Sequence, residues 1–269
     1  MGKGQSSLMK ALTPRRDISP ALGLSAGSLV AGLILLFWCA ITYGRLVDTT
    51  FCPPPHKVLL ALWKVIADGS LFKHAWASLV VINLGFLLSS IIAIPFGIMM
   101  GSFRIVAAAL EPVVNFTRYL PVTSMIPLLI LWIGIGLEEK VAVIFIGTFF
   151  QQIVMFADVS AQVPEELFNA GYTLGASRRQ VVTKVLLPAT LPGVMDVLRV
   201  TMGWAWTYLV VAELVASTSG LGYMSMQAMR GLHADTIFVA ILAIGFLGMV
   251  TDQIFKWIKA VWLPWAGQR

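Results

Sequence analysis

Long stretches without charged residues are the feature that most constrains how this chain can fold. Asp, Glu, Lys and Arg are absent from five runs, and a sixth apolar region, 193–215, contains only isolated charges. A helix needs about 20 mostly apolar residues to cross a bilayer. We therefore predict an all-α membrane protein with six transmembrane helices, near residues 22–43, 76–101, 116–136, 140–158, 193–216 and 236–257.

The distribution of basic residues predicts the orientation of these spans. With 58% hydrophobic and 12% charged residues, the composition excludes an ordinary soluble domain. The net charge of +6 therefore reports orientation and not nucleic-acid binding, because Lys and Arg accumulate on the cytoplasmic side of membrane proteins. Six spans place both termini on one side, and twelve of the 19 Lys and Arg residues fall there against six on the other. We predict that both termini are cytoplasmic.

The longest polar interruption in the second half of the chain, 158–192, predicts a short amphipathic helix between two spans. Pro164 followed by Glu165 and Glu166 suits a helix start, because negative charge is favourable at the helix N-terminus. Residues at helical spacing then form one face that includes two small residues: Leu167, Ala170, Gly171 and Leu174. Gly175 is expected to end the helix, and the basic pair Arg178-Arg179 follows. A helix in the lipid headgroups and an ordinary ordered loop are the alternatives.

This segment resembles the cytoplasmic EAA loop of ABC-transporter permeases, whose pattern is E-A-A, three residues, G, nine residues and I-x-L-P. Gly175 is followed by nine residues and then by Val185-Leu186-Leu187-Pro188, while Asn169-Ala170-Gly171 stands in place of E-A-A. In that family the loop is a coupling helix that sits in a groove of the ATPase subunit. The resemblance implies ATPase-coupling roles for Glu165, Glu166, Asn169, Ala170, Gly171, Leu174, Gly175 and Arg178.

The third span indicates a subfamily. Pro121 and Pro127 interrupt it, so it is expected to face the protein interior, where freed backbone carbonyls can be covered. The stretch PVTSMIPLLILWIGIG is similar to a segment of the permeases for nitrate, bicarbonate, taurine and alkanesulfonates. The segments 203–215, GWAWTYLVVAELV, and 220–224, GLGYM, resemble the same subfamily, and the similarity covers roughly residues 55–265.

The resemblance implies a type I ABC importer permease in the bacterial inner membrane. Its expected partners are a second copy of the chain, two cytoplasmic ATPase subunits, an external substrate-binding protein or lipoprotein, and membrane lipid. ATP and magnesium would bind the ATPase subunits, so this chain is expected to carry no cofactor. The expected cargo is a small anion: nitrate, bicarbonate, or a sulfonate such as taurine. We expect a cytoplasmic segment, 1–21, and one permease domain, 22–269, containing the coupling loop 158–192.

Polar residues inside the spans are candidates for function by default. Asp196 and Arg199 are three residues apart on one helix face, so we predict that they pair as a structural clamp. Gln151 and Gln152 are expected to hydrogen-bond across helices, within the subunit or at the dimer seam, and they are also candidates for lining the path. The predicted translocation path uses neutral polar groups: Thr123, Ser124, Gln151, Gln152 and Thr207.

Two other functional classes, an intramembrane enzyme and a secondary transporter, fit the sequence less well. An intramembrane enzyme needs a nucleophile beside a base, and the candidates Ser217, Ser219 and His233 all lie in one external loop. The sequence has no G-x-S-x-G, H-E-x-x-H or P-loop motif, so we predict that the chain is not an enzyme. An ion-driven secondary transporter favours inverted repeats with broken helices in matching positions, whereas only the third span is visibly broken.

Overall fold

The computed structural model describes residues 19–215 and 217–267, and within these ranges the regular secondary structure is helical. The chain comprises two compact units, Met1–Leu60 and Ala61–Arg269. The single permease domain over 22–269 stays a prediction. The predicted cytoplasmic segment 1–21 lies, except for its last three residues, outside the described part.

The first unit contains α2 (Pro20–Tyr43) and the start of α3 (Pro55–Ala67). Ser19 caps α2 by accepting a hydrogen bond from the Leu22 N–H at 3.3 Å, and proline occupies the first helical position, where its missing N–H costs nothing. Trp38 Nε1 donates to the Pro53 carbonyl at 3.1 Å, which holds the connecting loop against α2. The predicted first span at 22–43 is confirmed as a helix long and apolar enough to cross a membrane.

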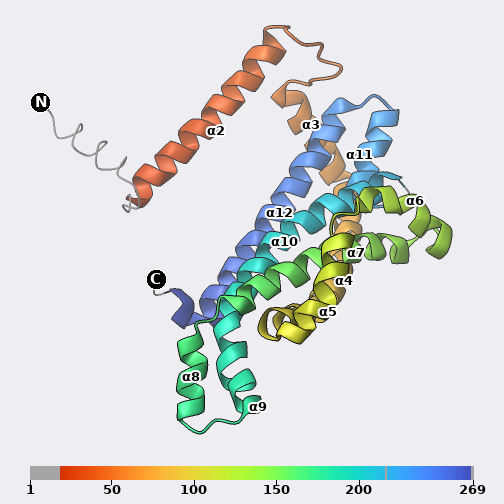
Figure 1. Ribbon diagram of the computed structural model, residues 1–269. Coiled ribbons are helices and arrows are strands. Elements are labelled where there is room, and N and C mark those ends of the chain that lie inside the picture. Colours follow the sequence, from red (N-terminus) through yellow and green to blue (C-terminus); the bar gives the residue numbers. More distant parts are fainter. Residues whose placement is uncertain (1–18, 216, 268–269) are drawn as a thin grey trace, which may run out of the picture. The chain divides into compact units, whose positions relative to one another are not determined.

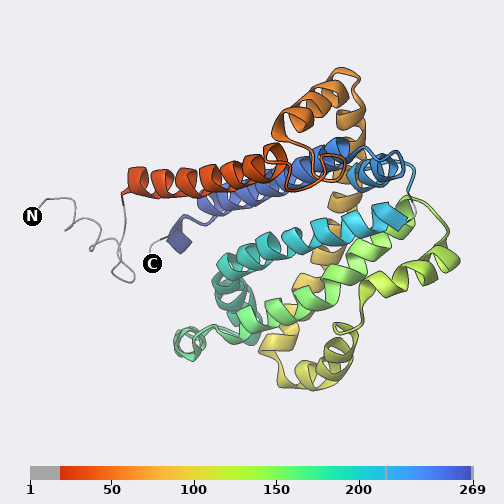
Figure 2. The ribbon, with the colours of Figure 1, turned by 90° about the horizontal axis from the view of Figure 1, so that it is seen from above.

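The second unit is built on four long helices, α4 (Ser70–Ser102), α7 (Leu137–Ala161), α10 (Leu187–Val215) and α12 (Ala234–Trp262). Figures 1 and 2 show α7, α10 and α12 running in similar directions, with α4 crossing them. In the described part of the chain, these helices and α2 are the five that are individually long and apolar enough to cross a membrane.

The candidate for the sixth crossing is a bent pair of helices, so the interruption expected in the third span is confirmed, although the pair begins at residue 104 and not near residue 116. The pair consists of α5 (Arg104–Thr117) and α6 (Val122–Ile133), whose directions differ by 91°. Pro121 explains the break, because its ring disfavours a helical conformation at the preceding residue and it offers no N–H to continue the helix. Pro127 lies inside α6 without ending it, and Gly134 ends α6 at a φ of +90°.

The helices α4 and α7 approach closely because glycines line their contact. A Cβ at Gly97 would lie 2.5 Å from the Cβ of Phe156, and one at Gly101 would lie 2.1 Å from the carbonyl oxygen of Ala157. Small residues four apart are the usual means by which membrane helices bring their backbones together. The result is a tightly joined pair, with a buried cluster that includes Ile98, Phe156 and Leu186 toward one end.

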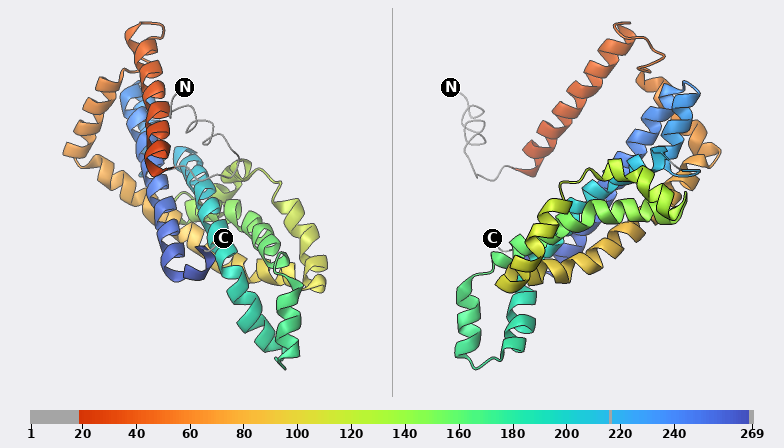
Figure 3. Two further views of the ribbon diagram at one scale, coloured as in Figure 1. Left: turned by 90° about the vertical axis from the view of Figure 1, so that its left-hand side faces the viewer. Right: turned by 45° about the vertical axis from the view of Figure 1, so that its right-hand side comes forward.

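Short helices occupy the two ends of the bundle. At one end α8 (Glu165–Thr173), α9 (Arg178–Val181) and the π-helical turn Val182–Leu186 form a projecting hairpin, visible in both views of Figure 3. We call these elements the 165–186 hairpin, and its returning part, Arg178–Leu186, the second limb. At the opposite end lies α11 (Leu221–Arg230), and the short 3-10 helix Pro264–Gly267 follows α12.

Candidate functional site

The first arm of the 165–186 hairpin is the short helix expected from the sequence. Pro164 is its N-cap residue, and Glu165 and Glu166 lie in the first turn. The helix ends where Gly175 adopts a φ of +79°, with the Ala176 N–H donating to the Gly171 carbonyl and the Gly175 N–H to the Tyr172 carbonyl. This pair of bonds is the Schellman arrangement, which needs a residue that tolerates the left-handed conformation. The predicted glycine stop is confirmed.

The second limb begins with a reciprocal cap. The Ser177 hydroxyl accepts from the Gln180 N–H at 3.4 Å, and the Gln180 side-chain carbonyl accepts from the Ser177 N–H at 2.8 Å. From Arg178 the chain stays helical for 38 residues, to Val215 at the far end of α10. The second limb is therefore a direct extension of a membrane helix. The helix that contains the predicted fifth span, 193–216, begins earlier, at Arg178, because the π-helical turn lets the helix pass Pro188 without ending.

The two faces of α8 differ. Its inner face packs on the second limb and the bundle through Phe168 and Gly171, and a Cβ on Gly171 would lie 3.4 Å from Val181 and 3.5 Å from Val185. Leu167, one turn before Gly171, and Leu174, just after the helix, keep 44% and 87% of their surface, so part of the exposed surface of the hairpin is apolar. Gly171 thus belongs to the inner face. The remaining predicted coupling residues are exposed: Glu165, Glu166, Asn169, Ala170, Leu174, Gly175 and Arg178.

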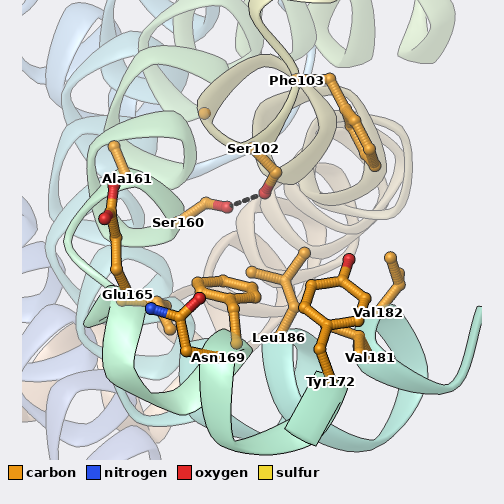
Figure 4. A pocket seen from close by; sticks show the side chains of 13 residues that line it. Ser102, Phe103, Ser160, Ala161, Glu165, Asn169, Tyr172, Val181, Val182 and Leu186 are labelled. Carbon is orange, nitrogen blue, oxygen red and sulfur yellow. Dashed lines mark hydrogen bonds between the residues drawn. The ribbon is translucent and has the colours of Figure 1, made fainter. Parts of the chain in front are cut away.

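A cavity of about 390 Å³ lies between the hairpin and the ends of α4 and α7 (Figure 4). Glu165, Asn169 and Tyr172 of α8 line one side, and residues of the second limb, including Leu186, line another. At its upper edge the hydroxyls of Ser102 and Ser160 are 2.5 Å apart. The contact between the hairpin and the bundle is therefore incomplete at the base of α8.

The predicted path residues divide into a buried group and an exposed group. Gln152 is fully buried and binds three hydroxyls: its amide nitrogen donates to Ser90 at 3.0 Å and Thr201 at 3.1 Å, and its oxygen accepts from Ser89 at 2.8 Å. These bonds join α4, α7 and α10. The hydrogen bonding that the sequence predicted for Gln152 therefore lies within the subunit, and its burial argues against a path-lining role.

The other predicted path residues are more accessible. Gln151 is half-buried, whereas Thr123 and Ser124 at the start of α6 and Thr207 on α10 are exposed. Thr123 and Ser124 lie on α6, Gln151 on α7 and Thr207 on α10. They remain candidates for a path that a second copy of the chain would complete.

The predicted pair between Asp196 and Arg199 is wrong. Arg199 Nε donates to Asp252 at 2.5 Å, and Asp196 accepts from Lys259 at 2.6 Å. Both partners lie on α12, and Lys256 also bonds Asp252, at 2.7 Å. A neighbouring helix supplies partners with better geometry than a residue three positions away on the same surface. The charges join α10 to α12, so they are a clamp between helices.

Sequence reasoning missed a polar cluster at the opposite end of the bundle. The buried carboxylate of Glu213 accepts from the Ser78 hydroxyl at 2.7 Å and from the Gly222 N–H at 2.8 Å. His74, at the start of α4, accepts from the Gly220 N–H at 3.2 Å. The sequence offered one signal, the isolated acidic residue Glu213 within an apolar run shortly before Gly220-Leu221-Gly222.

Residues 93–261 match the profile of the family described as binding-protein-dependent transport system inner membrane component. The chain is 31% identical over 259 residues to the taurine transport system permease protein TauC of Escherichia coli strain K12, with 94% of each chain covered. It is 32% identical over 243 residues to the putative aliphatic sulfonates transport permease protein SsuC of Bacillus subtilis strain 168, covering 90% of this chain and 88% of the relative.

A solved structure has the same architecture. A chain of the inward-facing MetNI methionine ABC transporter superposes with a TM-score of 0.59 and 22% sequence identity, covering 71% of this chain and 97% of that chain. At this identity the likeness shows a shared fold.

Proposed function

Because the chain belongs to the family of binding-protein-dependent transport system inner membrane components, with the fold of a type I ABC importer permease, we propose that it imports a small sulfonate in partnership with a cytoplasmic ATPase. The observation that carries the ATPase partnership is the exposed apolar surface of the hairpin, which includes Leu167 near its base and Leu174 at its tip, on an extension of a membrane helix. An apolar patch rimmed by charges is typical of a protein interface.

The geometry suggests how ATP hydrolysis would be coupled to movement of the membrane helices. ATP and magnesium would bind the ATPase subunits, whose closure would move the two hairpins of a dimer together. The second limb runs without interruption into α10, so a displacement at α8 would tilt that helix. Because Gln152 ties α10 to α4 and α7, those three helices would move as one body. The bent pair α5 and α6, outside this bonded core, is the element we expect to change its position.

The assembly we propose contains two copies of the chain, two ATPase subunits and an external substrate-binding protein or lipoprotein. The hairpin and both termini face the cytoplasm, as the twelve-to-six distribution of basic residues favours. The translocation path would run between the two copies past Thr123, Ser124, Gln151 and Thr207. Affinity for the anion would reside in the binding protein, so that neutral polar side chains, which bind the anion weakly, would be sufficient along the path.

The names of the relatives favour a sulfonate as the cargo. Both TauC and SsuC are named for sulfonate transport, and the alignments extend over most of each chain. Nitrate and bicarbonate, which the sequence resemblance also suggests, are the competing anions.

Reconstitution tests the proposal. The chain would be placed in liposomes with its ATPase and binding protein. Uptake of labelled taurine would be measured with ATP on the side of the ATPase and without ATP. The measurement with ATP would be repeated in the presence of excess nitrate or bicarbonate. We expect ATP-dependent taurine uptake that neither competing anion suppresses. Uptake of nitrate or bicarbonate alone would contradict the sulfonate assignment, and failure of any ATPase to co-purify would contradict the partnership.

A further inference from the structure

The start of α11 is held by side chains from other helices. Its N-cap residue is Gly220, which has no side chain to satisfy the first N–H groups of the helix. The Leu221 N–H donates to the Ser78 hydroxyl of α4 at 2.9 Å, and the Gly222 N–H donates to the Glu213 carboxylate of α10 at 2.8 Å. The Gly220 N–H itself donates to Nδ1 of His74 at 3.2 Å. The cap is thus built from two neighbouring helices.

The space around this cap fixes its geometry. Glu213 is 1% exposed, and a Cβ added to Gly220 would lie 2.2 Å from its carboxyl group. Gly220 also has a φ of +116°, which disfavours any residue with a side chain. Because α11 packs against α4, α10 and α12, the cap determines how the ends of these three helices are joined.

His74 is the member of the cap whose side chain can change its protonation state near neutral pH. To accept the Gly220 N–H, Nδ1 must carry a lone pair, so the imidazole is neutral with its proton on Nε2. The imidazolium has no acceptor, and its positive charge is unfavourable at the N-terminus of a helix. The ring is half-buried, so protons from the adjoining solution can reach it.

Charged and titratable groups lie near this ring or are bonded to the cap that it joins. Lys73 and Asp68 lie on or just before α4 and carry opposite charges. From α11, the Tyr223 ring lies 5.8 Å from the imidazole, and from α10 Glu213 reaches the cap through Ser78. From α7, Lys140 donates to Ser217 in the turn before Gly220, at 2.8 Å. Of these groups, the imidazole is the one that both bonds the turn and titrates near pH 6.5 when unperturbed.

We propose that His74 is a positioning residue for import, which fixes the start of α11 when neutral and releases it when protonated from the external solution. The inference rests on the proposed function and on its orientation, in which this end of the bundle faces outward. Release would loosen the joint between the outer ends of α4, α10 and α12, and the outer part of the path would lose its shape. Import would then fall in acid.

Two substitutions separate the hydrogen bond from the charge. In His74→Asn, the amide oxygen takes the place of Nδ1 as an acceptor and does not titrate. In His74→Leu, no acceptor remains at any pH. For uptake into proteoliposomes of buffered internal pH, we expect wild-type import to fall several-fold as the external pH decreases from about 8 to about 5. We expect His74→Asn to show no such decrease and His74→Leu to import slowly throughout.

A second measurement does not depend on transport. Hydrogen exchange of the Gly220, Leu221 and Gly222 amides, corrected for the intrinsic pH dependence, should accelerate below about pH 6 in the wild type and not in His74→Asn. Identical pH profiles of uptake and identical exchange in these two proteins would overturn the proposal, even if His74→Leu did not fold. A pH-dependent exchange without any sulfonate uptake would support the cap and contradict the proposed function instead.

Discussion

Gly171 on α8 lies against Val181 of the second limb, so closely that a Cβ on the glycine would be 3.4 Å from the valine Cγ2. This contact sets the separation of the two arms of the 165–186 hairpin. It leaves room for one methyl group and none for a larger side chain. The exposed surface of α8, which we propose as the ATPase docking surface, is positioned relative to the second limb by this contact.

The contact predicts a size limit at position 171. Gly171→Ala should keep the hairpin and stabilise α8 by roughly 0.5–1 kcal/mol, because alanine is the better helix former. Gly171→Leu should push α8 off the second limb and abolish ATPase co-purification, while membrane insertion is unchanged. Affinity purification from membranes measures this, with the alanine variant as the matched control. Normal co-purification of the leucine variant would show that the separation of the arms is unimportant.

The Gln152 cluster predicts a loss of stability without a change in substrate affinity. Gln152→Leu removes three hydrogen bonds between helices, each worth roughly 0.6 kcal/mol in a membrane protein, so we expect a loss of about 2 kcal/mol. Gln151→Leu, at the half-buried neighbouring position, is the control and should cost less. Denaturant titration in detergent measures both. If Gln152→Leu raised the substrate concentration needed for half-maximal uptake and left stability unchanged, Gln152 would be a residue that lines the translocation path.

The sequence predicted what depends on local pattern. The spans follow from hydrophobic length, and the end of α8 follows from Gly175, whose left-handed backbone almost only glycine adopts readily. The interruption of the third span was predicted from Pro121 and Pro127, but the two prolines look alike in the sequence, and only Pro121 lies at the break, whereas Pro127 lies within α6. His74 and Gly220 are 146 positions apart, and no local pattern indicates that they meet.

The charged clamp between α10 and α12 predicts a small energetic coupling. Arg199 and Asp252 side chains keep 39% and 35% of their surface, and exposed ion pairs contribute roughly 0.2–1 kcal/mol. A double-mutant cycle of Arg199→Gln and Asp252→Asn should therefore give a coupling free energy within that range, without a change in substrate preference. If Arg199→Gln assembled normally and lost anion transport, or accepted neutral solutes, Arg199 would be a selectivity residue.

The distribution of basic residues predicts the accessibility of single cysteines. In a Cys39→Ser background, the native Cys52 should react with a membrane-impermeant thiol reagent applied to intact cells with the outer membrane permeabilised. With Cys52 also replaced, Ser177→Cys in the hairpin should react only after the inner membrane is opened. The opposite pattern of labelling would invert the proposed topology and place the hairpin outside.

The most direct test of ATPase docking on the 165–186 hairpin uses two substitutions at Gly175. Asn and Asp both tolerate the left-handed conformation, so either should preserve the end of α8. Aspartate adds a negative charge beside the exposed Leu174, at the helix end where the dipole is already negative. ATPase co-purification and taurine uptake should be measured together for both variants. We predict that Gly175→Asn retains both and that Gly175→Asp loses coupled uptake at normal expression; wild-type uptake by Gly175→Asp would contradict docking at this surface.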